Sequence, residues 1–258
     1  DKTRNLKGMG RPFHALFNRN KRSVQMDLTT EAGQAALHKL MQTADVFVEN
    51  FRDASLAKSG ADPKEMAAKY PDLIIASHKG FLSGPYEDRT ALDEVVQMMT
   101  GLAYMTGPTG RPLRVGASAT DIMGGLFATV GVVCSLLERE KGGKGRSIRV
   151  GLFETCLNII AQHMVQFELE GVDPPPMPER DFAWPVYDIF MTADAKQIFV
   201  GAVTEGQWVS LCNILGMDDL LADETLQTRP DQIEARDRTI PVFAKAMLEN
   251  NSDELATA

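Results

Sequence analysis

Leu73-Ile74-Ile75-Ala76-Ser77 is the stretch that decides the fold. This apolar run has the length of a strand, and strands buried on both faces of a parallel sheet have this composition. Outward along the chain, residues 45–49 (DVFVE) and 148–152 (IRVGL) also read as strands. Helical patterns separate the three segments, which indicates an α/β fold with a parallel sheet.

Capping residues predict where the intervening helices begin. Thr29 or Thr30 offers an N-cap for a helix that continues to Met41, and Asp62-Pro63 combines a cap with a proline in the first turn of a helix that ends at Lys69. We expect further helices over residues 93–104, 121–141, 154–170 and 207–215, and further strands over residues 24–28, 186–191 and 197–203.

A proline-rich connector divides the chain. Pro174-Pro175-Pro176 and Pro178 form a stiff linker, so we place a domain boundary near residue 175. A large domain is expected over residues 1–175, and the linker with a smaller α+β domain over residues 176–258. The chain begins without methionine and ends within a helical pattern, which we interpret as a piece of a longer protein.

Charge and cysteine content narrow the class of protein. The net charge is -8 and the pI about 5.1, which argues against a general binder of nucleic acid or membrane surfaces. No signal peptide or apolar run of membrane-spanning length is evident. Cys134, Cys156 and Cys212 lie in apolar stretches and are expected to be buried free thiols, which suits the cytoplasm.

Common catalytic and cofactor motifs are absent from the sequence. The four histidines, His14, His38, His78 and His163, have no HxxxH or HxH spacing, so no metal site is expected. There is no GxSxG elbow of a serine hydrolase and neither of the glycine-rich nucleotide fingerprints.

One loop is a candidate site because of its place in the fold. Residues 78–85 (HKGFLSGP) follow directly on the strand at residues 73–77. In open α/β sheets, ligands bind outside the carboxyl ends of the strands. A ligand is therefore expected at this loop.

Asp121 is the most interesting titratable residue. It stands at the start of a long apolar helix, followed by Gly124-Gly125. From the residues alone, a capping aspartate is the simpler interpretation. A carboxylate there is also well placed to attack a thioester and form a mixed anhydride, with backbone N–H groups near the oxyanion.

Several segments, in order along nearly the whole chain, together resemble the class III CoA-transferase family (also called CaiB/BaiF). These are residues 18–24 (NRNKRSV) leading to Asp27-Leu28, residues 44–52 (ADVFVENFR), residues 71–77 (PDLIIAS), Gly80-Phe81, Gly84-Pro85, Gln97, Gly101-Leu102, residues 106–108, Asp121, residues 142–145, Phe153-Glu154, and Tyr187, Phe190, Thr192 and Asp194.

The resemblance implies a fold and an activity. Family members have a large Rossmann-like domain and a smaller domain, and two chains interlock as a homodimer. The family's catalytic aspartate corresponds to Asp121, which would move CoA from an acyl-CoA donor to a carboxylic acid acceptor without a tightly bound cofactor. Glu154, a first-turn acid, does not match that position. The resemblance implies that the family's first strand and early CoA-binding loop precede Asp1, and that its C-terminal return to the large domain follows Ala258.

The resemblance also assigns CoA-binding residues. Asn50 and Phe51 match the adenine and ribose side of the family's CoA site. Lys21, Lys58 and Lys79 fall where family members place basic or CoA-contacting residues, which the phosphates of CoA require in an acidic protein.

Two alternatives stay open. The fold also hosts 2-methylacyl-CoA racemases, but Leu92 stands where those enzymes have a proton-shuttling histidine. A CoA-binding protein without turnover is the other alternative, and such a protein would not need Asp121.

The glycine-rich loop of formyl-CoA transferases is missing between residues 171 and 185, which argues against formyl or oxalyl specificity.

Nothing in the sequence names the acid substrates. His78, Arg89, Arg111 and Arg114 could meet a dicarboxylate, since arginine binds carboxylates through two hydrogen bonds. We therefore expect a small dicarboxylic acid such as succinate.

Overall fold

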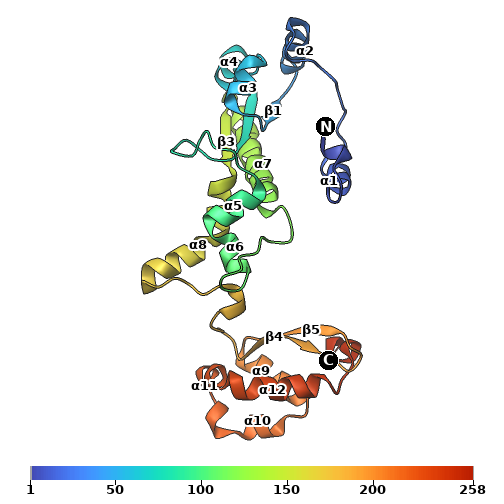
Figure 1. Cartoon of the computed structure of the whole chain (residues 1–258), viewed down its shortest axis with the longest axis vertical. Coiled ribbons are helices and arrows are strands. Elements are labelled where there is room, and N and C mark those ends of the chain that lie inside the picture. Colours follow the sequence, from blue (N-terminus) through green and yellow to red (C-terminus); the bar gives the residue numbers. More distant parts are fainter. Residues whose placement is uncertain (1, 258) are drawn as a thin grey trace. The chain divides into compact units, whose positions relative to one another are not determined.

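The computed structural model describes residues 2–257, which form two compact units divided between Pro178 and Glu179 (Figure 1). The boundary predicted near residue 175 lies just before this division. The first unit contains a 3-10 turn at Lys2–Asn5, α1 (Gly10–Phe17), α2 (Glu31–Met41), β1 (Val46–Glu49), α3 (Asp53–Lys58), α4 (Pro63–Lys69), β2 (Ile74–Lys79), α5 (Asp93–Thr100), α6 (Leu102–Thr106), α7 (Ala119–Glu140), β3 (Ser147–Gly151) and α8 (Leu152–Glu170).

The first unit is built on a parallel sheet in the order β1-β2-β3. Helices α3 and α4 connect β1 to β2, and α5 to α7 connect β2 to β3. β2 is the central strand, and Ile74, Ile75 and Ala76 are at most 1% exposed, as the predicted strand requires. The expected mixed α/β fold with a parallel sheet is confirmed.

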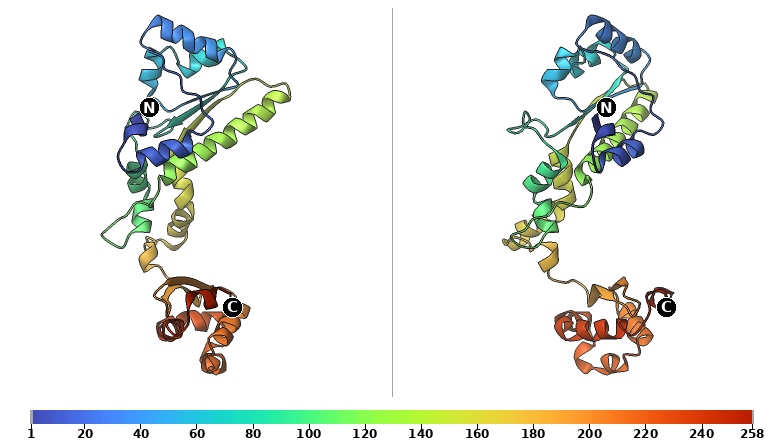
Figure 2. Two further views of the ribbon diagram at one scale, coloured as in Figure 1. Left: turned by 90° about the vertical axis from the view of Figure 1, so that its right-hand side faces the viewer. Right: turned by 45° about the vertical axis from the view of Figure 1, so that its right-hand side comes forward.

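Helices pack on the sheet and on one another. Leu37 of α2, Leu56 of α3 and Met66 of α4 form one apolar cluster with Ile75 of β2. Val96 of α5 joins a second cluster with residues of α6 and α8. The long helix α7 lies along β2 and β3, as both views in Figure 2 show.

The second unit joins an antiparallel hairpin to a group of short helices. Its elements are a 3-10 turn at Met177–Glu179 that leads into it, β4 (Val186–Met191), β5 (Gln197–Ala202), α9 (Glu205–Ile214), α10 (Asp218–Ala222), a 3-10 turn at Glu224–Leu226, α11 (Arg229–Glu234), α12 (Arg236–Met247) and α13 (Ser252–Thr257). The rings of Trp208 and Phe243 meet edge to face in its core, and both side chains are almost fully buried.

Three local predictions are wrong. Residues 24–28 form no strand, because no strand within residues 2–257 lies beside them and a strand needs a hydrogen-bonded neighbour. The helix expected over residues 93–104 breaks at Gly101, which adopts a left-handed φ of 90° and separates α5 from α6. Cys134 is exposed on α7, whereas Cys156 and Cys212 are buried.

Helix α7 also departs from expectation in its surroundings. By length and composition it is apolar enough to span a membrane, contrary to the expectation that the chain has no such run, and only 17% of its most apolar window is buried. One such helix is weak evidence for a membrane span, because core helices of soluble proteins pass the same test, and an exposed apolar patch also marks a protein–protein interface. Its exposed apolar residues are Ile122, Leu126, Phe127, Val130, Val133 and Leu137.

Candidate active site

The candidate site lies where the parallel strands end. The register pairs Lys79 at the end of β2 with Gly151 at the end of β3, and β1 ends beside them at Glu49. The residues that follow these strands, Asn50, Gly80 and Leu152, therefore emerge at one edge of the sheet and line one cavity. This is the edge at which open α/β sheets bind ligands.

Two adjoining cavities occupy this edge. One has a volume of about 400 Å³ and the other about 230 Å³. They share Asn50, His78, Lys79, Gly80 and Ala91 as lining residues. The larger cavity also contacts Phe51 and Arg52, whereas the smaller one contains Asp121, Leu92 and Asp93. The predicted loop at residues 78–85 thus contributes to both cavities.

Asp121 is the third residue of α7, which begins at Ala119. It is therefore not the N-cap that the residues alone suggested. The first turn is held instead by the buried carboxylate of Asp93 on α5. Oδ1 of Asp93 accepts hydrogen bonds from the backbone N–H of Thr120 (2.8 Å), the hydroxyl of Thr120 (2.6 Å) and the N–H of Asp121 (3.3 Å). A residue of another helix thus does the work of a cap.

The surroundings of Asp121 favour its protonated form. Burial raises the pKa of this carboxyl, the nearby Asp93 raises it further, and Arg114 partly opposes both. Arg114 itself is paired with Glu94 of α5. A raised pKa makes a carboxylate a stronger nucleophile once it is ionised.

Lys79 is largely buried and fully engaged within the chain. Its ammonium lies 2.9 Å from a carboxylate oxygen of Glu49 and 2.7 Å from one of Asp53, and it donates to the backbone oxygen of Phe51 (2.7 Å). Glu49 also accepts from the N–H of Phe51 (2.9 Å). These contacts use all three donors of the lysine, so Lys79 holds the turn at Asn50 and Phe51 in place.

Two arginines are better placed than Lys79 to meet an anion. Arg52 and Arg89 line the larger cavity without a carboxylate partner in residues 2–257, whereas Arg149, which also lines it, is paired with Asp53 (3.3 Å) and Glu87 (3.1 Å). Arg52 donates to the hydroxyl of Thr90, and Arg89 lies over the ring of Tyr86. Arg52 was not among the predicted site residues, although it directly follows the Asn50-Phe51 motif.

His78 contributes a buried nitrogen with no hydrogen-bond partner in the described chain. This nitrogen is Nε2, and no hydrogen bond is formed by Nδ1 either. Burial lowers the pKa of His78, and Glu49 only partly offsets this, so the ring is neutral at neutral pH. Gly124 makes room for the ring, because a Cβ at that position would lie 2.2 Å from Nε2.

The remaining sequence-predicted residues lie outside both cavities. Lys21 is exposed and donates to Asn18, and Lys58 ends α3. Arg111 lies on an exposed loop, and it lines neither cavity. Their assignment to CoA or acid binding stays a prediction. Glu154 accepts from the N–H of Leu82 (3.0 Å) and so fixes the loop at the end of β2.

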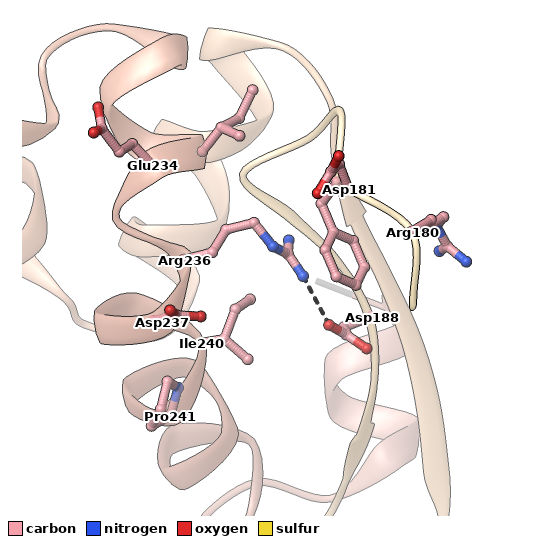
Figure 3. A pocket seen from close by; sticks show the side chains of 10 residues that line it. Arg180, Asp181, Asp188, Glu234, Arg236, Asp237, Ile240 and Pro241 are labelled. Carbon is pink, nitrogen blue, oxygen red and sulfur yellow. Dashed lines mark hydrogen bonds and ion pairs between the residues drawn. The ribbon is translucent and has the colours of Figure 1, made fainter. Parts of the chain in front are cut away.

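A further cavity of about 550 Å³ lies in the second unit (Figure 3). Arg236 points across it to Asp188 (2.9 Å) and also donates to the backbone oxygens of Trp184 and Pro185. Its guanidinium stacks on Phe182 at 3.6 Å. The arginine is thereby engaged within the unit.

The profile of CoA-transferase family III matches residues 1–258 of this chain. The chain is 32% identical to succinate–glutarate CoA-transferase of Agrobacterium fabrum over 95% of its length and 62% of the relative's, and 30% identical to acetyl-CoA:oxalate CoA-transferase of Acetobacter aceti over 91% and 61%. A solved CaiB/BaiF family protein of Brucella suis superposes with a TM-score of 0.79 at 28% identity, over 92% of this chain and 63% of that one. The chain therefore spans about three fifths of these relatives.

Proposed function

This chain belongs to CoA-transferase family III, and on that premise we propose that the protein moves CoA from an acyl-CoA donor to a carboxylic acid with Asp121 as nucleophile. The observation that carries the proposal is the place of Asp121, in a small cavity that adjoins a larger one at the carboxyl ends of the strands. The acyl group would occupy the smaller cavity and part of CoA the larger one.

The proposed chemistry begins with attack on the thioester. A carboxylate oxygen of Asp121 bonds to the acyl carbonyl carbon and the C–S bond breaks. CoA leaves as a thiolate, and the acyl group stays on Asp121 as a mixed anhydride. The thiolate then attacks the aspartyl carbonyl, which releases the donor acid and leaves an aspartyl thioester. The acceptor carboxylate attacks that thioester and displaces the CoA thiolate, which leaves a second mixed anhydride. The thiolate then attacks the acyl carbon of the acceptor in this anhydride, which forms the new acyl-CoA and frees the carboxylate of Asp121.

Leu92 supports a transferase over an isomerase. It lines the small cavity beside Asp121, at the position where the racemase alternative needs a histidine. A leucine side chain has no group that can carry a proton. This supports a mechanism with a nucleophile over one that needs that proton shuttle.

The smaller cavity supports a short acid as substrate. At about 230 Å³ it is below the usual range of ligand pockets, so it suits an acid of few carbons. The relatives named for succinate, glutarate and oxalate act on acids of this size. We propose a small dicarboxylate as acceptor, with CoA thioesters as substrates and no tightly bound cofactor.

A second copy of the chain is proposed to cover α7. The exposed apolar face of this helix supports a homodimer, interlocked as the family implies, over a membrane span. Sedimentation of the full-length protein should then give the mass of two chains. The three free cysteines support a reducing location such as the cytoplasm.

Trapping with hydroxylamine tests the covalent step. The full-length protein is incubated with a panel of acyl-CoA donors and then with hydroxylamine, which converts an activated aspartyl carbonyl into a hydroxamate. We expect mass spectrometry to find a hydroxamate on the peptide that contains Asp121, formed only in the presence of a productive donor.

The neighbouring acids serve as internal controls for this experiment. Asp93 and Glu154 lie at the same edge of the sheet but hold backbone N–H groups, so neither should be modified. Measurable CoA binding without any adduct would argue for a binding protein without turnover, and a hydroxamate on Glu154 would refute the assignment of the nucleophile.

A further inference from the structure

The small cavity offers few free donors to a substrate. Lys79 lines it, but its donors are all engaged by groups of the chain itself, and Asp93 acts there only as an acceptor. Among its polar lining residues, Asn50 and His78 form no side-chain hydrogen bond within residues 2–257. The oxygen of an acyl group at Asp121 gains negative charge during attack and needs such a donor.

His78 is held against the helix that carries Asp121. Its Nε2 meets Gly124, where a Cβ would lie 2.2 Å away and would be 2.9 Å from Cε1 of the same ring. Gly124 follows Asp121 by three residues, which places the two on one face of α7. The contact with Gly124 thus fixes the imidazole beside the nucleophile.

The contact also favours one tautomer of the ring. Nε2 is buried and faces the Cα of Gly124, which offers no hydrogen-bond acceptor. A lone pair is accommodated there better than an N–H group, which would be a buried donor without a partner. The single hydrogen of the neutral ring then resides on Nδ1, which is free of any partner in the described chain.

We propose that the Nδ1–H group of His78 donates a hydrogen bond to the acyl carbonyl oxygen while Asp121 attacks the carbonyl carbon. No proton is transferred in this step. The C–O bond to Asp121 forms, the C–S bond breaks, and the hydrogen bond stabilises the charge that develops on the carbonyl oxygen. This role rests on the proposed function, and it gives Gly124 a purpose, which is to admit the ring.

Rates of hydroxamate formation test the role of His78. We expect His78→Phe, which keeps a ring of similar size, to slow formation of the aspartyl adduct by about 10²-fold, the usual effect of losing one oxyanion donor. Because His78 also lines the larger cavity, the dissociation constant of CoA is measured alongside, and the comparison is made at saturating acyl-CoA. His78→Gln supplies an amide N–H and should recover part of the rate, which a purely structural role would not predict.

Gly124 and its neighbour provide a matched pair of variants. Gly124→Ala places a methyl group against Nε2 and should slow adduct formation by displacing the ring. Gly125→Ala meets nothing within 4 Å and should leave the rate unchanged, although both changes favour the helix by propensity. In the His78→Ala background, Gly124→Ala should have no further effect, because the methyl group then enters vacant space.

The outcomes separate this proposal from the one it rests on. If the wild-type protein forms no adduct at Asp121, the proposed function fails and the role of His78 fails with it. If the wild-type protein forms the adduct and His78→Phe forms it equally fast, only the role of His78 is refuted. A loss confined to donors that carry a second carboxylate would also refute it, because His78 would then recognise that carboxylate and not the reacting oxygen.

Discussion

Replacing Asp121 by alanine is expected to lower the rate of CoA transfer by about 10⁴-fold or more, because the variant cannot form the covalent intermediate. Binding of CoA should be nearly intact, since the larger cavity is lined by other residues. Steady-state assay of acyl-CoA formation and calorimetric titration with CoA measure the two quantities separately. Transfer at an undiminished rate in this variant would refute the mechanism.

The same variant is expected to keep its thermal stability. The pKa of Asp121 is raised in the folded protein, mainly by burial, so its ionised form is disfavoured by folding. The stabilising effect of the protonated group is complete below the pKa of the unfolded chain and is lost as pH rises through the folded pKa. At neutral pH the alanine variant should therefore unfold at the same temperature as the wild type or a higher one, which excludes misfolding as the cause of lost transfer.

The pH profile of transfer gives a second measure of this site. Because the carboxylate is the nucleophile, kcat/KM should fall as pH decreases through the raised pKa of Asp121, at a higher pH than an ordinary aspartate would give. Arg114 lowers this pKa, so Arg114→Met should move the acid limb to higher pH. A limb that does not move would show that another group controls the profile.

The sequence predicted elements whose signals are local. Asp62 accepts from the N–H groups of Lys64 and Glu65, and Thr30 accepts from that of Gly33, as their caps implied. The run at residues 73–77 predicted the central strand, because burial on both faces demands a continuous apolar segment. Topology then placed the loop after this strand at a ligand-binding edge.

Features that depend on distant residues were beyond the sequence. Asp93 on α5 caps the first turn of α7, which begins only at Ala119, and no residue near Asp121 in the chain indicates this contact. Lys79 was predicted from the resemblance to contact CoA, which stays a prediction, and its ion pairs with Glu49 and Asp53 of other elements could not be read from the sequence. The exposure of Cys134 likewise depends on what covers α7, which the sequence of one chain does not show.

Replacing Asp93 by alanine is expected to have the second largest effect, on both stability and transfer. Asp93 is buried, and besides its bonds to Thr120 and Asp121 it accepts from Nε2 of Gln97 (2.6 Å). Removing it leaves several buried donors without acceptors, which should cost on the order of 3 kcal/mol or more of unfolding free energy. Chemical denaturation measures this loss.

The effect of Asp93 on transfer arises from position. Without its acceptor, the first turn of α7 is no longer fixed, and a small displacement of the Asp121 carboxylate should lower kcat by about 10²-fold. The dissociation constant of CoA should change little, because the larger cavity does not include Asp93. A variant that binds CoA normally and turns over at the wild-type rate would show that the cap does not position the nucleophile.

A charge swap distinguishes the hydrogen-bond network from a general loss of packing. Gln97 cannot rotate its amide to suit Asp93→Asn, because its Oε1 already accepts from the N–H of Val115 (2.8 Å). The NH₂ group of the introduced asparagine would then face the NH₂ group of Gln97. In the double variant Asp93→Asn with Gln97→Glu, the introduced glutamate accepts from both the asparagine and Val115, with the net charge unchanged. This double variant should be more stable and more active than Asp93→Asn alone, since every donor around the first turn of α7 regains an acceptor. Equal losses of stability and activity in the two variants would mean that the arrangement of donors is not what holds Asp121.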